Sequence, residues 1–153
     1  MLKSTKQFDK ALYEKFDKKA KDVAVAYLES NGYHVFLEPF GKFDVDLGAR
    51  KDGKGILVEV EVRENWKDGS FPFRTIHLPK RKEKFLNHTF PVFIFAFRSD
   101  LKRFVVIPGE ILEDQRVVMV SNKYMSNEKF FDIPITSCEE ITLEGKKDEN
   151  KTF

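Results

Sequence analysis

Two short segments of the sequence carry carboxylates at alternate positions. Asp44 and Asp46 lie in FDVDLGAR, and Glu59 and Glu61 lie in GILVEVEVR. Because side chains of a strand alternate between the two faces of a sheet, each pair shares one face. Carboxylate oxygens are the ligands that Mg²⁺ and Mn²⁺ prefer, so the spacing predicts a divalent cation site. The alternative is a solvated strand face whose carboxylates pair with cations nearby, namely Lys42, Arg50 and Arg63.

The KDGK segment at positions 51–54 is a strong hairpin signal, because Asp-Gly populates the turn that matches strand twist. A two-residue turn places Asp46 opposite Glu59 and Asp44 opposite Glu61, whereas a turn two residues longer places Asp46 opposite Glu61. Like charges in facing positions destabilise a sheet by about 0.2 to 1 kcal/mol per pair, so a cation is expected nearby. The other face of the hairpin is apolar and is expected to join the core, through Val45, Leu47, Ala49, Ile56, Val58, Val60 and Val62.

The rest of the sequence predicts one α/β domain around a single sheet. Apolar residues at three- and four-residue steps predict a long helix that starts at Ser4 or Thr5 and ends at a cap at Gly32. Residues 64–75 are expected to form an ordered loop, followed by a short strand broken at Pro79 and a short basic helix. Further strands are expected at 33–40, 43–50, 55–63, 92–97, 104–108 and 117–120, of which 92–97 has the apolar character of a central strand buried on both faces. FFDIP (130–134) and ITLE (141–144) are expected to be short edge strands, in a domain that spans 1–145 and is followed by a flexible tail at 146–153.

Composition excludes several classes of protein. A length of 153 residues argues for one domain, and a net charge of +2 is too balanced to indicate nucleic-acid binding by itself. Cys138 is the single cysteine and the three histidines lack zinc-site spacing, so any metal must be held by oxygen ligands. No apolar run is long enough for a membrane span and the N-terminus lacks a signal-peptide pattern. An intracellular, cytoplasmic protein with no membrane partner is therefore expected.

The order of these elements resembles the PD-(D/E)xK nuclease superfamily over about residues 8–97. That family has a long helix, a strand, and an Asp-bearing strand hairpinned to a strand with an acidic-x-Lys tripeptide. Asp46 matches the Asp position, with Asp44 a second candidate, and Glu59-Val60-Glu61 matches the tripeptide. The resemblance implies a restriction-endonuclease-like fold, in which a mixed sheet is flanked by helices. It also implies a supporting acidic residue from the first helix, for which Glu14 is the best-placed candidate and Glu29 the other.

The resemblance further implies metal-dependent hydrolysis of phosphodiester bonds. Asp46 and Glu59 would bind Mg²⁺ or Mn²⁺, which polarises a phosphodiester oxygen and lowers the pKa of a bound water that attacks phosphorus. The sequence departs from the family at Glu61, which stands where the family has Lys. Glu61 could itself act as a base or hold a second cation. Otherwise the missing positive charge must come from another lysine brought close by folding, with three candidates: Lys42, Lys80 and Lys82.

The segment PKRKEK at 79–84 is the best candidate for contact with nucleic acid. Lys80, Arg81 and Lys82 follow one another in it and could contact backbone phosphates. A solvated helix end is the alternative interpretation.

Three aromatic residues, Trp66, Phe71 and Phe73, precede this basic segment. They could stack on the bases of an unpaired strand, because aromatic faces bind bases without sequence preference. Packing within the loop or core is the expected role. His77 is likewise expected to be structural, with proton transfer as the alternative.

The sequence therefore predicts a Mg²⁺-dependent endonuclease or exonuclease that acts on nucleic acid, with DNA favoured and with a homodimer as one assembly to consider. Asp46, Glu59 and Glu61 would be catalytic, with Glu14 and Asp44 in support. An alternative is a non-catalytic nucleic-acid-binding or assembly module that keeps the fold without the motif Lys. A third hypothesis is a structural hairpin in a protein-binding subunit, which would bind neither metal nor nucleic acid.

Overall fold

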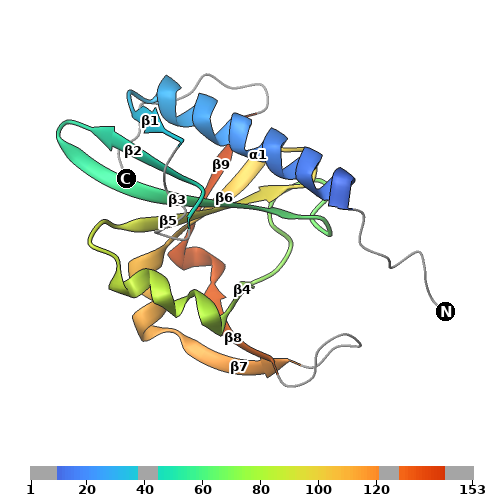
Figure 1. The fold of residues 1–153 in the computed structure, drawn as a ribbon. Coiled ribbons are helices and arrows are strands. Elements are labelled where there is room, and N and C mark those ends of the chain that lie inside the picture. Colours follow the sequence, from blue (N-terminus) through green and yellow to red (C-terminus); the bar gives the residue numbers. More distant parts are fainter. Residues whose placement is uncertain (1–9, 38–44, 121–127, 144–153) are drawn as a thin grey trace.

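The computed structural model describes residues 10–37, 45–120 and 128–143 and contains two sheets (Figure 1). The six-stranded sheet has the order β1 (His34–Phe36), β2 (Leu47–Lys51), β3 (Lys54–Arg63), β5 (Val92–Arg98), β6 (Arg103–Pro108) and β9 (Glu139–Thr142). The three-stranded sheet has the order β4 (Thr75–Pro79), β8 (Glu128–Pro134) and β7 (Arg116–Val120). The helices are α1 (Lys10–Ser30) and three 3₁₀ segments, η3 (Lys80–Asn87), η4 (Gly109–Asp114) and η5 (Ile135–Ser137).

The six-stranded sheet is mixed. Strands β3 and β5 pair in parallel, and the other neighbouring strands of this sheet pair antiparallel. Helix α1 lies across one face of this sheet, and η3 and the three-stranded sheet lie on the other (Figure 1). The expected α/β fold, a mixed sheet flanked by helices, is confirmed. No helix in the described part of the chain is long and apolar enough to cross a membrane.

Helix α1 ends at the predicted cap. Gly32 has a φ of +91°, a conformation that glycine adopts without steric strain. The N–H of Gly32 donates to the carbonyl of Glu29 and the N–H of Tyr33 donates to the carbonyl of Leu28, both at 3.0 Å. This pair of bonds is a Schellman motif, which satisfies carbonyls that the helix leaves without partners. The predicted helix start, at Ser4 or Thr5, lies outside the described residues.

The β2–β3 hairpin has the register predicted from its two-residue turn. Asp52 and Gly53 both have positive φ, 53° and 78°, as a type I′ turn requires. The pairing runs from Lys51 opposite Lys54 to Leu47 opposite Val58. The longer turn that would have placed Asp46 opposite Glu61 is therefore excluded.

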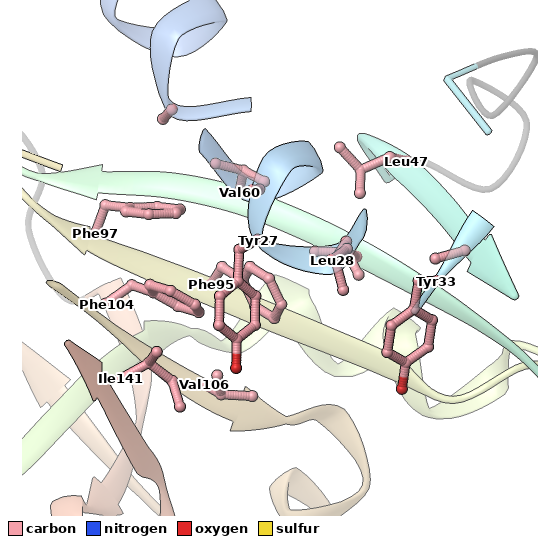
Figure 2. Packing of buried hydrophobic residues seen from close by; sticks show 14 of the residues in the cluster. Tyr27, Leu28, Tyr33, Leu47, Val60, Phe95, Phe97, Phe104, Val106 and Ile141 are labelled. Carbon is pink, nitrogen blue, oxygen red and sulfur yellow. The ribbon is translucent and has the colours of Figure 1, made fainter. Parts of the chain in front are cut away.

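The six-stranded sheet is buried on both faces. Between the sheet and α1, residues of the helix pack on strand residues that include Val60, Phe95 and Phe104 (Figure 2). The ring of Tyr27 meets that of Phe104 edge to face, with centroids 5.0 Å apart. The opposite face packs on η3, η4 and the three-stranded sheet. Strand β5 contributes to both clusters, so its prediction as a central strand buried on both faces is confirmed.

Three expectations about the strands are wrong. The single predicted sheet is two sheets, and the segment 130–134 belongs to β8, the central strand of the smaller one. Alternate residues of β8, Phe131 and Ile133, are buried against the larger sheet, which fixes its position. Val45 was expected on the same face as Leu47, but it packs in the opposite cluster. The cause is a bend at residues 45 and 46, before β2 begins, which breaks the alternation of side chains.

Candidate functional site

Asp46 lies at the end of the β2–β3 ladder, one residue before β2. Its N–H donates to the carbonyl of Val58 at 3.1 Å, and its Oδ2 accepts from the N–H of Val60 at 2.7 Å. The side chain of Asp46 thus accepts the hydrogen bond of Val60, where the backbone pairing of the two strands ends. Its Oδ1 lies 3.2 Å from Nζ of Lys21 in α1. Nζ of Lys21 also lies 3.1 Å from Oδ2 of Asp17 on the same helix. Burial lowers the pKa of Lys21, but Asp17 and Asp46 together raise it by more, with a net increase.

Glu59 lies on the face of β3 opposite α1, where its Oε2 is 2.5 Å from Nζ of Lys82 in η3. Both side chains of this ion pair are only 13% exposed. Burial raises the pKa of Glu59, Lys82 lowers it, and the negative charges of Glu61 and Asp46 raise it, with a net increase. Glu61 and Asp46 are therefore both close enough to Glu59 to repel it, and Lys82 partly balances the charge of Glu59.

Glu61 is the next residue on the same face of β3, by the alternation of strand side chains. Its Oε2 accepts from Nε of Arg63 at 2.5 Å. Arg63 also donates from Nη2 to the carbonyl of His77 at 2.8 Å, which ties β3 to β4. Glu61 thus lies beside Glu59, but its carboxylate pairs with Arg63.

The basic segment divides into buried and exposed cations. Lys82 reaches Glu59, whereas Lys80 pairs with Glu83 at 2.6 Å and Arg81 is exposed. Of the three lysines considered as a replacement for the motif Lys, the structure therefore brings Lys82 to the carboxylates. Lys42 lies outside the described residues.

The supporting carboxylates are placed less fully. Asp44 lies outside the described residues, and Glu14 belongs to α1, whose described side chains begin further along the helix. Glu29 lies in the last turn of α1, is exposed, and is far along the helix from Lys21. Among its described side chains, α1 brings Lys21 to Asp46, and Asp17 of the same helix pairs with that lysine. Lys21 was not among the candidate site residues, although it directly follows Ala20, which is buried in the core.

The donor atoms of Asp46 and Glu59 suit a hard divalent cation. Among the described residues, no three side chains of His, Cys, Asp or Glu gather as a metal-binding group. Two carboxylates are nevertheless enough for Mg²⁺, which commonly binds through one or two of them and fills its other positions with waters and substrate phosphate.

Known proteins match this chain in part. No family model matches. The chain is 36% identical over 70 residues to a UPF0102 protein of Chloroherpeton thalassium, which covers 44% of this chain and 54% of that protein. It is 34% identical over 74 residues to a UPF0102 protein of Bacteroides thetaiotaomicron, which covers 47% and 60%. The chain spans little more than half the length of these curated relatives.

Two solved structures resemble the fold at low sequence identity. The bacterial homing endonuclease I-Ssp6803I aligns with a TM-score of 0.48 and 14% identity over 95% of this chain and 82% of that chain. The Holliday junction resolvase Hjc of Archaeoglobus fulgidus aligns with a TM-score of 0.46 and 13% identity over 77% and 95%. Both TM-scores are below 0.5, so these similarities do not by themselves establish a shared fold.

Proposed function

We propose that this protein is a metal-dependent nuclease that hydrolyses phosphodiester bonds, with DNA as the favoured substrate. The observation that carries the proposal is the position of Lys82, 2.5 Å from Glu59, beside the end of the ladder where Asp46 lies. Two carboxylates from paired strands and one cation from a separate element are the groups that metal-assisted phosphodiester hydrolysis uses.

Asp46 and Glu59 would hold Mg²⁺ or Mn²⁺, because both present the hard carboxylate oxygens that these ions prefer. When bound, the ion supplies a Lewis acid and a water of lowered pKa. Asp46 would keep its second oxygen on the N–H of Val60, so the ligand is held by the backbone of β3.

Lys82 would bind an oxygen of the reacting phosphate and so supply the positive charge that position 61 lacks. Its alkyl chain runs through a largely buried site, since only 13% of the side chain is exposed, which restricts where Nζ can lie. Glu61 would act as a positioning residue, because its carboxylate already accepts from Arg63 and holds that guanidinium in place.

One observation favours a non-catalytic nucleic-acid-binding module as the second candidate. Asp46 and Glu59 each have a lysine partner, so both carboxylates have a counter-charge without any metal. In that case the hairpin would be a structural ion-pair cluster. A homodimer remains a prediction under either function.

Metal-dependent cleavage tests the proposal. Labelled single-stranded, duplex and branched DNA, and matched RNA, would be incubated with Mg²⁺, with Mn²⁺ or with chelator. We expect cleavage only with metal, and loss of at least about 100-fold in Glu59→Gln and Lys82→Ala, as is typical for removal of a group that stabilises transition-state charge.

Lys18→Ala is the matched control, because Lys18 forms an exposed surface pair with Asp22 on α1 and is not among the candidate nucleic-acid contacts. It should change the rate much less than Lys82→Ala. Binding of these substrates without metal-dependent cleavage of any of them would contradict the nuclease proposal and support the binding module.

A further inference from the structure

A pocket of about 620 Å³ lies at the C-terminal end of β3, next to β4. Its lining combines aromatic rings with polar groups that can donate or accept hydrogen bonds, and the residues that matter here are Trp66, Phe71, Phe73, Asn65, His77 and Arg63. The pocket is built mainly by the loop between β3 and β4, which connects the larger sheet to the smaller one.

The aromatic side of the pocket is a ladder of edge-to-face rings. The Trp66 and Phe71 centroids are 5.3 Å apart at 86°, and those of Phe71 and Phe73 are 5.8 Å apart at 73°. Trp66 is 2% exposed, whereas Phe73 is 63% exposed. Core packing therefore explains Trp66 but does not explain the exposed ring of Phe73.

The loop that carries these rings is anchored between Trp66 and Phe71. The indole of Trp66 donates to the carbonyl of Gly69 at 3.0 Å, and the buried guanidinium of Arg98 donates to the same carbonyl at 2.9 Å. The N–H of Phe71 donates to Oε1 of Glu140 in β9 at 3.0 Å. Trp66 and Phe71 are thus held in place before any ligand arrives, and Phe73 packs edge to face on Phe71, which lowers the entropic cost of binding.

The polar side of the pocket is also held. Nε2 of His77 lies 3.0 Å from Oδ1 of Asp132 in β8, which fixes the imidazole, and Asn65 adds an amide that can both donate and accept. The exposed ring of Phe73 beside these polar groups matches a nucleobase, which has a π-face for stacking and a polar edge.

The pocket continues the row of charged residues on β3. Arg63 lines it and pairs with Glu61, and Glu61 follows Glu59 on the same face. At about 3.3 Å per residue, the α-carbons of Glu59 and Arg63 are about 13 Å apart along the strand. A strand of nucleic acid with its phosphate at Asp46 and Glu59 could therefore place a neighbouring base at the pocket.

We infer that this pocket binds an unpaired nucleobase, with Phe73 as the stacking platform, and that the substrate is single-stranded or locally unpaired nucleic acid. The inference rests on the proposed function, because it takes the carboxylate cluster as the place of the scissile phosphate. A base paired within a duplex has both faces stacked on its neighbours, so it must leave the helix to occupy the pocket.

Binding measured in chelator tests the inference without cleavage. Three fluorescein-labelled DNAs of equal length would be compared by anisotropy: a single strand, a strand of abasic sugar-phosphate, and a blunt duplex. The abasic strand keeps the phosphates and removes only the bases. We expect the single strand to bind roughly 5- to 100-fold more tightly than the abasic strand, from the free energy of stacking one base on an aromatic residue.

Phe73→Ala should remove most of that difference, and Phe73→Tyr, which keeps the ring, should retain it. Phe90→Ala is the matched control, because Phe90 is also an exposed phenylalanine, at 43%, and lies near Gly55 at the other end of β3. Trp66 is the only tryptophan in the sequence, so its fluorescence should change with the single strand and not with the abasic strand.

Equal affinity for the single and abasic strands, or equal effects of Phe73→Ala and Phe90→Ala, would overturn the inference, as would the absence of binding to any of the three DNAs. Metal-dependent cleavage is measured separately. A nuclease that cleaves but shows no dependence on bases would keep the proposed function and lose the base pocket.

Discussion

Nζ of Lys82 lies 2.5 Å from Oε2 of Glu59, although 23 residues separate the two in the sequence. The strand β4 and the first turn of η3 carry Lys82 to the face of β3 that bears Glu59. This ion pair connects the two sheets, because Glu59 belongs to the larger sheet and Lys82 follows a strand of the smaller one.

Loss of this ion pair should destabilise the fold more than loss of a surface pair. Lys82→Met keeps much of the side-chain volume but leaves Glu59 without its counter-charge in a largely buried site. We expect the free energy of unfolding to fall by about 3 kcal/mol, the lower end of the range for a broken buried pair. Lys80→Met, which breaks the more exposed pair with Glu83, should cost about 1 kcal/mol or less. Urea unfolding measures both, and equal losses would contradict the structure.

The hairpin register could be predicted from sequence because it depends on a local signal. Asp52 and Gly53 fix a two-residue turn, and the turn then sets each facing pair from Lys51 and Lys54 outward. The same logic failed at Val45, because the bend before β2 depends on the hydrogen bonds that Asp46 makes with β3. No periodicity in the sequence reports such a bend.

The second sheet could not be predicted because its pairing is long-range. His77 in β4 lies opposite Asp132 in β8, 55 residues later, and no turn signal connects two such distant strands. For the same reason the sequence offered three lysines for the charge missing at position 61 and could not choose among them. The contact between Lys82 and Glu59 follows from the path of β4 and η3, which only the tertiary structure defines.

Cys138 should be a slow thiol. Burial raises the pKa of its thiol to about 11, so about one molecule in a thousand carries the thiolate at pH 8. Alkylation by iodoacetamide at pH 8 should be at least about 100-fold slower in the folded protein than in urea, because the thiolate is the reactive form.

The same shift has a consequence for stability. The pKa of the Cys138 thiol is higher in the folded protein than in the unfolded chain. The contribution of this thiol to the free energy of unfolding is therefore fully present below about pH 8.5 and is lost as the pH rises toward 11. Cys138→Ala should flatten this part of the stability profile. Rapid alkylation of the folded protein at pH 8 would show that the thiol is not buried as described.

Asp132 should stabilise the smaller sheet in a pH-dependent manner. Its carboxylate lies 2.7 Å from Arg116 and 3.0 Å from His77, and the bond from Arg116 is the main cause of its lowered pKa. A lowered folded pKa gives stability that is present above the unfolded pKa and lost as the pH falls through the folded one. Asp132→Asn should therefore cost about 1 kcal/mol at pH 7, since Arg116 is mostly exposed.

That cost should shrink as the pH falls below about 3.9, where the wild-type carboxylate becomes protonated in the unfolded chain and then in the folded one. Chemical denaturation of both proteins between pH 2 and pH 7 measures the difference. A gap between wild type and Asp132→Asn that stays constant down to pH 2 would show that the ionised carboxylate does not contribute.

Thermal unfolding with and without divalent ion tests most directly whether Asp46 and Glu59 form a metal site. An ion that binds the folded protein alone stabilises it by about 1.4 kcal/mol at ten times its Kd, which corresponds to a rise in Tm of about 3 to 6 °C. Asp46→Asn keeps an oxygen that can accept from the N–H of Val60 but loses the charge, so its Tm in chelator should be close to that of wild type. Asp22→Asn is the control, because Asp22 forms an exposed surface pair with Lys18 on α1. The proposal predicts that Mg²⁺ or Mn²⁺ raises the Tm of wild type and of Asp22→Asn but not that of Asp46→Asn; a wild type indifferent to either ion, or an Asp46→Asn protein that gains as much, would contradict it.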